Sequence, residues 1–525
     1  MLRAAAQWPE IQFAGCSRSL QKRIFEKYVF AKYTFAMDVR SLRLRRPEPF
    51  FNRSAELSAL ARGWAGHGGK LALVFGRRRL GKTYLLQRFF TEPEDVKRCC
   101  YYLADQTTPD NQRLSFAERL IESLPARGLT APEIAVSWNS LLRFAADRAS
   151  DIPEGERFGL VLDEFPYLAA QSPELPSVLQ AWWDNEGIHS RMFVVLCGSQ
   201  LSFMQALGLE SAPLYGRFNA GILRVEPMSY LDCADFYRNS PLYGPLEKLV
   251  MYGALGGTPR YHAMVDVGRK WQDELVDLLM RPGAPLESEP RFLLSSENVR
   301  DPAPLHSVLG AIAKGKMRHA EIQQATGIES QALTHPLRVL QELRWVRREK
   351  PFGETSDSRA IYRIADPFLL FWYRFVAPMA SALQFNEPPV VFREFVAPYI
   401  SDYMGLNVFE SVCTQWLMRR AHSELQVTIR DVGRYWSRDG SQEIDIVAEL
   451  SDGKMLFGEC KWSANRPLEV RAYSDLRAKI AALPNRHWAD GAKFVLFSLG
   501  GFSEGLMRVA ESEANLLLVG PDKLF

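Results

Sequence analysis

At 525 residues the chain exceeds the size of a single hydrophobic core, so we expect three or four domains. Its 47% apolar and 24% charged residues are typical of globular protein, and a net charge of +3 identifies no nucleic-acid partner by itself. No apolar run approaches the roughly 20 residues that span a bilayer, which argues against a membrane protein. The seven scattered cysteines favour a reduced, cytoplasmic protein.

Residues 1–50 differ from the rest because they hold ten Lys/Arg residues against four Asp/Glu. They lack a clear apolar core, so a secretory signal is not indicated. We interpret them as a basic N-terminal extension, for which two explanations remain open. Either translation starts at Met37, or residues 1–36 form a loosely ordered basic segment.

A glycine-rich loop links the apolar segment 71–75 to a helical segment, 84–90. Its glycines allow tight turns that direct backbone N–H groups at phosphate oxygens, its lysine reaches the β- and γ-phosphates, and its threonine offers a hydroxyl to Mg²⁺. The helix would present its N-terminus to the same anion. The predicted nucleotide-binding residues are Gly76, Arg77, Arg78, Arg79, Leu80, Gly81, Lys82 and Thr83. The three arginines either contact phosphate or, for at least two of them, decorate an exposed loop.

Two further apolar segments, 158–162 and 192–197, end in polar residues. Asp163 follows the first segment and would hold Mg²⁺ together with Thr83, while Glu164 would act as general base on the attacking water. Ser199 follows the second segment and either senses the γ-phosphate or caps a helix. The acids predict hydrolysis beyond mere binding, and the absence of an Asn-Lys-x-Asp motif favours ATP over GTP.

Several motifs together resemble the archaeal-type ATPase family, which belongs to the AAA+/STAND group of P-loop proteins. They are FNRSAEL (51–57), GRRRLGKT (76–83), LDEFPYL (162–168), PLYGR (213–217) and YGALGGTPRY (252–261). The resemblance implies a P-loop ATPase core in residues 51–230 and a helical lid in residues 231–300. It also implies that Arg217 is an arginine finger and Arg260 a sensor cation, and that homo-oligomers form through the ATPase domain. The alternative for Arg217 is a surface ion pair worth under about 1 kcal/mol.

Residues 301–385 contain the order of elements found in a winged helix, which binds DNA in some proteins and docks protein in others. The predicted elements are helices 305–313, 319–326 and 330–343, then strands 345–348 and 361–364. The candidate DNA contacts are Gln331, Thr334, His335 and Arg338 on the third helix and Arg347, Arg348, Lys350 and Arg359 on the wing. Pro336 departs from a clean recognition helix. The aromatic segment 366–376 is interpreted as a core or interdomain helix.

Two predicted strands, 441–450 and 454–462, surround an Asp-Gly turn and form a hairpin. If the pairing is symmetric about the turn, paired residue numbers sum to 904, and Asp445 faces Glu459. Facing carboxylates repel unless a cation such as Mg²⁺ lies between them. Lys461 on the same face could stabilise charge on a phosphate. A β-bulge in the hairpin would break this register.

This Asp…Glu-x-Lys pattern lies in a predicted C-terminal domain, residues 386–525, that resembles the PD-(D/E)XK nuclease superfamily over residues 400–525. Ile444 stands where the superfamily name has proline. The resemblance implies catalytic roles for Asp445, Glu459 and Lys461. It implies metal binding by Asp445 and Glu459, with Glu410 as an additional acid. The alternative is an exposed hairpin with mixed charges, in which Lys461 forms an ordinary cross-strand pair with Glu443.

The predicted fold class is α/β: a P-loop NTPase parallel sheet with a helical lid, a winged helix, and a C-terminal restriction-endonuclease-like α/β domain. The leading hypothesis is an ATPase with ATP and Mg²⁺ as cofactors, whose nucleotide state controls a nuclease-like module. Its expected partner is nucleic acid, with DNA favoured over RNA. Two alternatives stay open, an ATP-driven oligomerising switch that cleaves nothing and a DNA-binding regulator that uses the winged helix.

Overall fold

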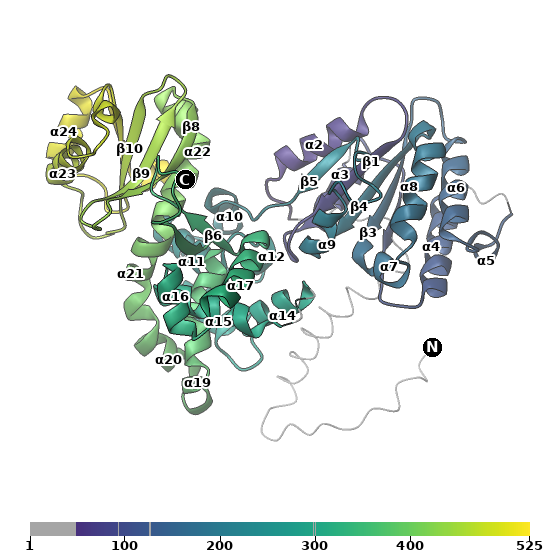
Figure 1. Cartoon of the computed structure of the whole chain (residues 1–525), viewed down its shortest axis with the longest axis horizontal. Coiled ribbons are helices and arrows are strands. Elements are labelled where there is room, and N and C mark those ends of the chain that lie inside the picture. The colour runs from purple at the N-terminus through teal and green to yellow at the C-terminus, as the bar shows by residue number, and fades with distance from the viewer. Residues whose placement is uncertain (1–48, 93, 125–127, 298, 300) are drawn as a thin grey trace.

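The computed structural model describes residues 49–92, 94–124, 128–297, 299 and 301–525 (Figure 1). Met37 and nearly all of the predicted N-terminal extension lie outside these residues. Figure 1 places the ATPase core on the right, a largely helical middle part below the centre, and a second sheet at the upper left. Among the described helices, none is long and apolar enough to cross a bilayer.

The ATPase core is built on a five-stranded sheet with the order β2-β3-β4-β1-β5. Its strands are β1 (Lys70–Phe75), β2 (Cys99–Leu103), β3 (Phe158–Asp163), β4 (Met192–Gly198) and β5 (Gly221–Arg224). All neighbouring strands run parallel. Such a sheet is covered on both faces, which explains its continuous apolar runs. Because β3, β4 and β1 are neighbours, the polar residues that follow them meet at one edge.

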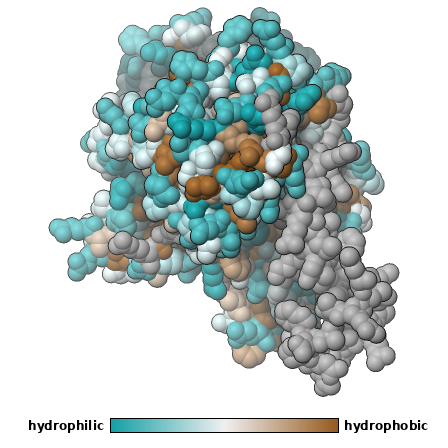
Figure 2. Space-filling view, turned by 90° about the vertical axis from the view of Figure 1, so that its right-hand side faces the viewer, coloured by the Kyte–Doolittle hydropathy of each residue, from teal (hydrophilic) through white to brown (hydrophobic). Residues whose placement is uncertain are grey.

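Helices cover both faces of this sheet, as Figure 1 shows. They include α2 (Ser54–Trp64), α3 (Lys82–Phe90), α4 (Pro109–Ser123), α5 (Ala131–Ile134), α6 (Trp138–Ala149), α7 (Phe165–Gln171), α8 (Leu175–Asn185) and α9 (Leu201–Ala206). The outer face of the core is mainly hydrophilic, with a small hydrophobic area near its middle (Figure 2). An area of this kind is ordinary for a protein surface.

The middle of the chain consists of short helices followed by the expected helix–helix–helix–hairpin order. The lid region holds α10 (Tyr230–Ala234), α11 (Pro245–Leu255), α12 (Pro259–His262), α13 (Trp271–Leu279) and α14 (Glu289–Ser296). The winged-helix elements are α15 (Ala303–Ala313), α16 (His319–Thr326), α17 (Ser330–Glu342), β6 (Val346–Glu349) and β7 (Ile361–Ile364). The aromatic segment that follows forms α18 (Pro367–Phe371) and a π-helical turn, Trp372–Val376, both largely buried, so its interpretation as a core segment is confirmed.

Several short turns lead from there through α19 (Ala382–Phe385), α20 (Pro388–Phe395) and α21 (Ile400–Tyr403) to the long helix α22 (Phe409–Leu425). The C-terminal sheet has the order β12-β11-β10-β9-β8. Its strands are β8 (Ile429–Trp436), β9 (Glu443–Leu450), β10 (Met455–Lys461), β11 (Lys493–Ser498) and β12 (Leu516–Val519). The helices α23 (Val470–Ala481), α24 (Glu504–Ser512) and α25 (Pro521–Leu524) complete the domain.

The C-terminal sheet is mixed, and its central hairpin has the predicted register. Strands β8, β9 and β10 pair antiparallel, whereas β10, β11 and β12 pair parallel. The β9–β10 pairs run from Met455 opposite Glu449 to Gly458 opposite Ile446, so paired numbers sum to 904 as expected. The register irregularities lie between β8 and β9 instead. The hairpin is therefore continuous up to the acidic residues.

The wing between β6 and β7 packs against the C-terminal sheet. The backbone N–H of Phe352 donates to the carbonyl oxygen of Arg434 at 2.7 Å, and Arg359 donates to the carbonyl oxygen of Trp436 at 2.9 Å. The remaining basic residues of the wing pair with nearby acids. The guanidinium of Arg359 is thus engaged within the protein, and its contact with phosphate stays a prediction. The four predicted contacts on α17 are all exposed.

Candidate active sites

The nucleotide-binding loop is held in shape by its own lysine and glycines. Lys82 opens α3 and donates from Nζ to the carbonyl oxygens of Gly76 at 2.9 Å and Arg77 at 3.2 Å. A Cβ atom at Gly76 would lie 2.4 Å from the carbonyl oxygen of Val225, so no side chain fits there. Gly81 has a φ of 86°, a conformation that L side chains rarely adopt. The loop is thus shaped before any phosphate arrives.

Thr83 and Asp163 bring together two oxygen-bearing side chains that could bind a metal ion. Asp163 is the last residue of β3, and Thr83 lies in the first turn of α3. Thr83 Oγ1 donates to Asp163 Oδ2 at 2.8 Å, and the hydroxyl of Tyr101 donates to the same oxygen at 2.5 Å. The other carboxylate oxygen accepts the backbone N–H of Glu164 at 3.0 Å. A hydroxyl and a carboxylate side by side suit Mg²⁺, which prefers hard oxygen ligands, so these residues fit the expected ion.

Tyr101 was missed by the sequence analysis, since a tyrosine in a strand is usually a core residue. It lies in β2, whose partner strand β3 carries Asp163 at its end. Burial, and after it the neighbouring carboxylate of Asp163, raises the pKa of Tyr101 well above its ordinary value. The hydroxyl is therefore a stable donor that fixes the orientation of the carboxylate.

Glu164 and Ser199 lie together across the ends of β3 and β4. Ser199 Oγ is 3.0 Å and 2.9 Å from the two carboxylate oxygens of Glu164, and the Ser199 backbone N–H donates at 3.3 Å. Glu164 itself adopts a left-handed conformation with a φ of 54°. Helix α9 is capped at Gln200, so the alternative that Ser199 caps the helix is wrong. The predicted general base, Glu164, and the predicted γ-phosphate sensor, Ser199, are thus hydrogen-bonded to each other.

The three arginines of the loop reach different parts of the molecule. Arg77 is 7% exposed, pairs with Asp366 and donates to Thr258 Oγ1 at 2.6 Å. Arg79 pairs with the buried Glu289 at 2.7 Å. The interpretation that at least two of the arginines merely decorate an exposed loop is therefore wrong for Arg77 and Arg79, which tie the loop to the lid and to α18.

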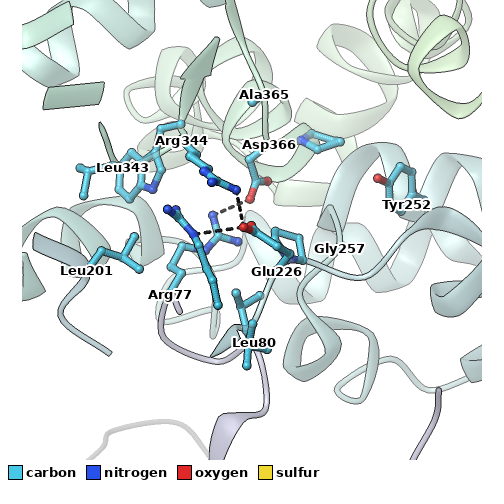
Figure 3. Close-up of a pocket in the computed structure, with 15 residues that line it drawn as sticks. Arg77, Leu80, Leu201, Glu226, Tyr252, Gly257, Leu343, Arg344, Ala365 and Asp366 are labelled. Carbon is cyan, nitrogen blue, oxygen red and sulfur yellow. Dashed lines mark hydrogen bonds and ion pairs between the residues drawn. The ribbon is translucent and has the colours of Figure 1, made fainter. Parts of the chain in front are cut away.

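A cavity of about 240 Å³ lies where the loop, the lid and the winged helix meet (Figure 3). Figure 3 shows Arg77 and Asp366 facing each other at this junction, with Arg344 directed at Glu226 nearby. Leu80 lines the same cavity, and its carbonyl oxygen accepts from Arg53 at 3.1 Å. The nucleotide loop thus contacts elements far along the chain.

Arg217 forms a two-pronged ion pair within its own chain. Its Nε and Nη2 lie 2.8 Å and 2.7 Å from the two carboxylate oxygens of Asp184 on α8. The hydrogen bond from Arg217 lowers the pKa of Asp184. The structure thus contains the surface ion pair that was the alternative interpretation. A finger role for Arg217 stays a prediction, as does the sensor role of the exposed Arg260.

The second site lies at the end of the β9–β10 hairpin. Asp445 Oδ2 accepts the backbone N–H of Cys460 at 2.8 Å. Glu459 is 6% exposed, and its two oxygens pair with Lys461 at 2.6 Å and with Lys479 of α23 at 3.2 Å. Burial and the nearby carboxylate of Glu459 raise the pKa of Asp445 to about 6. Lys479 was missed because no local motif connects a residue of α23 with the hairpin.

Glu410 does not complete a metal-binding group with these acids. Its carboxylate lies 3.1 Å from Arg434 Nε and 3.6 Å from Arg363 Nη1. Burial and Asp445 nevertheless raise the pKa of Glu410 to about 8. Within the described residues no group of three or more His, Cys, Asp or Glu side chains could hold a metal ion. The predicted grouping of Glu410 with Asp445 and Glu459 is thus wrong, because arginines occupy Glu410.

The alternative cross-strand pair between Glu443 and Lys461 is also absent. Glu443 pairs with Arg434, and Lys461 pairs with Glu459 instead. The acids that remain for a cation are Asp445 and Glu459. A cation there would replace lysine contacts, because Lys461 and Lys479 pair with the two oxygens of Glu459. Two neighbouring carboxylates are a ligand set with which proteins commonly hold Mg²⁺.

Comparisons with known proteins agree with the nucleotide site. Residues 50–265 match a family described as an ATPase domain predominantly from Archaea, and residues 372–473 match a family of archaeal and bacterial proteins of unknown function. An uncharacterized protein of Methanocaldococcus jannaschii is 29% identical over 436 residues, covering 82% of this chain and 91% of its own. An uncharacterized ATP-binding protein of the same organism is 40% identical over 53 residues, covering 10% of this chain and 88% of its own.

Two solved structures are similar at lower identity. A Walker-type ATPase of Pyrococcus abyssi has a TM-score of 0.47 at 21% identity, with 63% of this chain and 97% of that chain covered. The ORC2 protein of Aeropyrum pernix has a TM-score of 0.41 at 16% identity, with 66% and 98% covered. By sequence, residues 50–265 are thus similar to an ATPase domain found predominantly in Archaea, and residues 372–473 are similar to a domain of archaeal and bacterial proteins of unknown function.

Proposed function

We propose that this ATPase hydrolyses ATP with Mg²⁺ and that its nucleotide state controls a nuclease-like site in the C-terminal domain, with DNA as the favoured substrate. The observation that carries the first part is the meeting of Thr83, from the first turn of α3, with Asp163 and Glu164 at the end of β3. The second part rests on Asp445 and Glu459, which are adjacent to the last paired residues of the hairpin and interact electrostatically, with Lys461 paired to Glu459.

In hydrolysis, the loop N–H groups and Lys82 bind the phosphates, which requires Lys82 to leave the loop carbonyls that it contacts here. Mg²⁺, held by Thr83 and Asp163, would supply charge neutralisation at the phosphates. Glu164 accepts a proton from the water as the water oxygen bonds to the γ-phosphorus. The bond from that phosphorus to the bridging oxygen breaks, giving ADP and phosphate.

Control of the C-terminal site is supported by two sets of contacts between the domains. The ion pair of Arg77 with Asp366 joins the nucleotide loop to the residue that caps α18. Arg363 of β7 donates to the carbonyl oxygen of Leu406 at 2.9 Å and approaches Glu410 at 3.6 Å. A change at the nucleotide loop can therefore reach the winged helix and the neighbourhood of the acidic hairpin.

The decisive experiment incubates the protein with supercoiled and single-stranded DNA, Mg²⁺ and ATP. We expect the wild type to cleave DNA and Lys461→Ala to lose cleavage while it still hydrolyses ATP. Lys82→Ala should lose hydrolysis and ATP-dependent cleavage together. If the wild type cleaves neither substrate with any divalent cation, the C-terminal site is not a nuclease and the ATP-driven switch remains.

Binding of Mg²⁺ at the second site should depend on pH through Asp445, whose pKa is raised to about 6. The carboxyl group is ionised only above that pKa, so affinity is present at pH 7.5 and declines below pH 6. At pH 5 about one tenth of Asp445 is ionised, and the apparent affinity should be about tenfold lower. Calorimetric Mg²⁺ titration without nucleotide, compared with Asp445→Asn, measures this difference. If the wild type and Asp445→Asn differed in Mg²⁺ affinity by the same factor at pH 7.5 and at pH 5, Asp445 would not be the titrating ligand.

A further inference from the structure

Arg78 is the arginine of the nucleotide loop that forms no direct ion pair among the residues described, although its charge acts at longer range on Glu289 and Glu297. Its neighbours Arg77 and Arg79 each pair with a buried carboxylate. Arg78 instead donates to two neutral hydroxyl groups, those of Tyr167 and Ser199, the latter at 3.4 Å from Nε. A guanidinium that is held by hydroxyls can turn to an anionic ligand without breaking an ion pair.

Ser199 connects Arg78 to the general base. Ser199 Oγ, which accepts from Arg78, is also within 3.0 Å of both carboxylate oxygens of Glu164. Tyr167 lies in α7, the helix that directly follows Glu164. Because β1, β3 and β4 are neighbours, Arg78 spans from the end of β1 to the ends of the other two strands. The transferred phosphoryl group must lie between Lys82 and the general base, and Arg78 borders that space.

Arg217, which is expected to be the arginine finger, forms an ion pair with Asp184, unlike Arg78. Both prongs of its guanidinium are used by Asp184, at 2.8 Å and 2.7 Å. Arg217 would have to break a bidentate ion pair to reach a phosphate on any subunit, whereas Arg78 would give up only two bonds to hydroxyls.

We propose that Arg78 acts within its own chain as the catalytic arginine of ATP hydrolysis, an inference that rests on the hydrolysis proposed above. As the water oxygen bonds to the γ-phosphorus and the bridging P–O bond breaks, Glu164 takes the water proton. Negative charge then grows on the oxygens of the transferred phosphoryl group and of ADP. Arg78 donates N–H groups to these oxygens, and Ser199 and Tyr167 hold its side chain in position.

The first test measures Arg78→Ala and Arg78→Gln, the second of which retains donors for the hydroxyls but lacks the charge. We expect kcat to fall about a thousandfold in both variants, the lower end of the effect of a catalytic arginine. ADP affinity should stay at the wild-type value, whereas the tighter binding of ADP with aluminium fluoride should be lost. Loss of ADP affinity to the same extent would show a structural role and overturn the proposal. Arg143→Ala, at an exposed ion pair with Glu186, is the matched control and should keep wild-type kcat.

The second test mixes Arg78→Ala subunits with Glu164→Gln subunits. A residue that acts within its own chain leaves every site of the mixture defective, so no activity should return. Recovered hydrolysis would mean that Arg78 reaches the site of a neighbouring subunit, and this would overturn the proposal. Wild-type hydrolysis is measured alongside. A wild type without turnover refutes the proposed ATPase reaction itself, whereas an active wild type matched by Arg78→Ala refutes the role of Arg78 alone.

Discussion

Replacing Glu164 by glutamine is expected to lower kcat for ATP hydrolysis about 10²–10⁴-fold, the usual contribution of a general base. The amide cannot accept a proton from water, but it keeps the shape of the side chain and can still bond to Ser199, which lies 2.9 Å from one carboxylate oxygen. ATP binding depends on the loop and on Lys82, so the dissociation constant should change little. Steady-state phosphate release and equilibrium binding of ATP measure the two quantities separately.

The same substitution at the exposed Glu174, which precedes α8, is the control and should leave both quantities unchanged. Unchanged turnover in Glu164→Gln would show that another group accepts the proton. Weaker ATP binding together with lower kcat would instead show that Glu164 supports the shape of the site.

The second large effect is expected on stability, at the pair of Arg77 and Asp366. Both side chains are buried, with 7% and 6% of their side-chain surface exposed. Burial by itself would lower the pKa of Arg77, but Asp366, Tyr261 and Glu289 together outweigh it and the net direction is upward. Asp366→Asn keeps the shape and can still accept the N–H groups of Phe368 and Leu369 that Asp366 caps. It leaves a buried guanidinium without its counter-charge, which should lower the free energy of unfolding by about 3–5 kcal/mol.

Urea unfolding of Asp366→Asn, Arg77→Ala and the double variant measures this effect and its coupling. The double variant should lose less stability than the sum of the single variants, because it leaves no isolated charge. Arg217→Ala removes an exposed ion pair and should cost under about 1 kcal/mol, which calibrates the buried case. Additive single effects would mean that the pair contributes no coupling between the nucleotide loop and α18.

The parts of both sites that the sequence predicted depend on residues close together in the chain. The geometry of the loop from Gly76 to Thr83 depends on its own glycines and lysine. The position of Asp163 was predictable because it ends the apolar segment that forms β3. The hairpin register was predictable because a tight turn determines which residues face each other. These features do not depend on how the remainder of the chain packs.

Other parts of the sites were wrongly predicted or missed because their partners lie far away in the chain. The sequence suggested that Arg77 and Arg79 are surface arginines, because their partners Asp366 and Glu289 are distant in the chain and reach the loop only in the folded protein. Glu410 looks like a metal ligand until the strands β7 and β8 bring arginines to it.

The sequence by itself thus determined that the chain has an ATP-binding loop, an acidic strand end and an acidic hairpin, because each arises from local backbone geometry. Only the tertiary structure decided which charged side chains form ion pairs and with which partners. It directed two of the three loop arginines to buried acids, left Arg78 bonded to the hydroxyl of Ser199, and packed the wing against the C-terminal sheet. The physical reason is that the partner of a charged side chain is selected by packing between distant segments, for which a local pattern contains no signal.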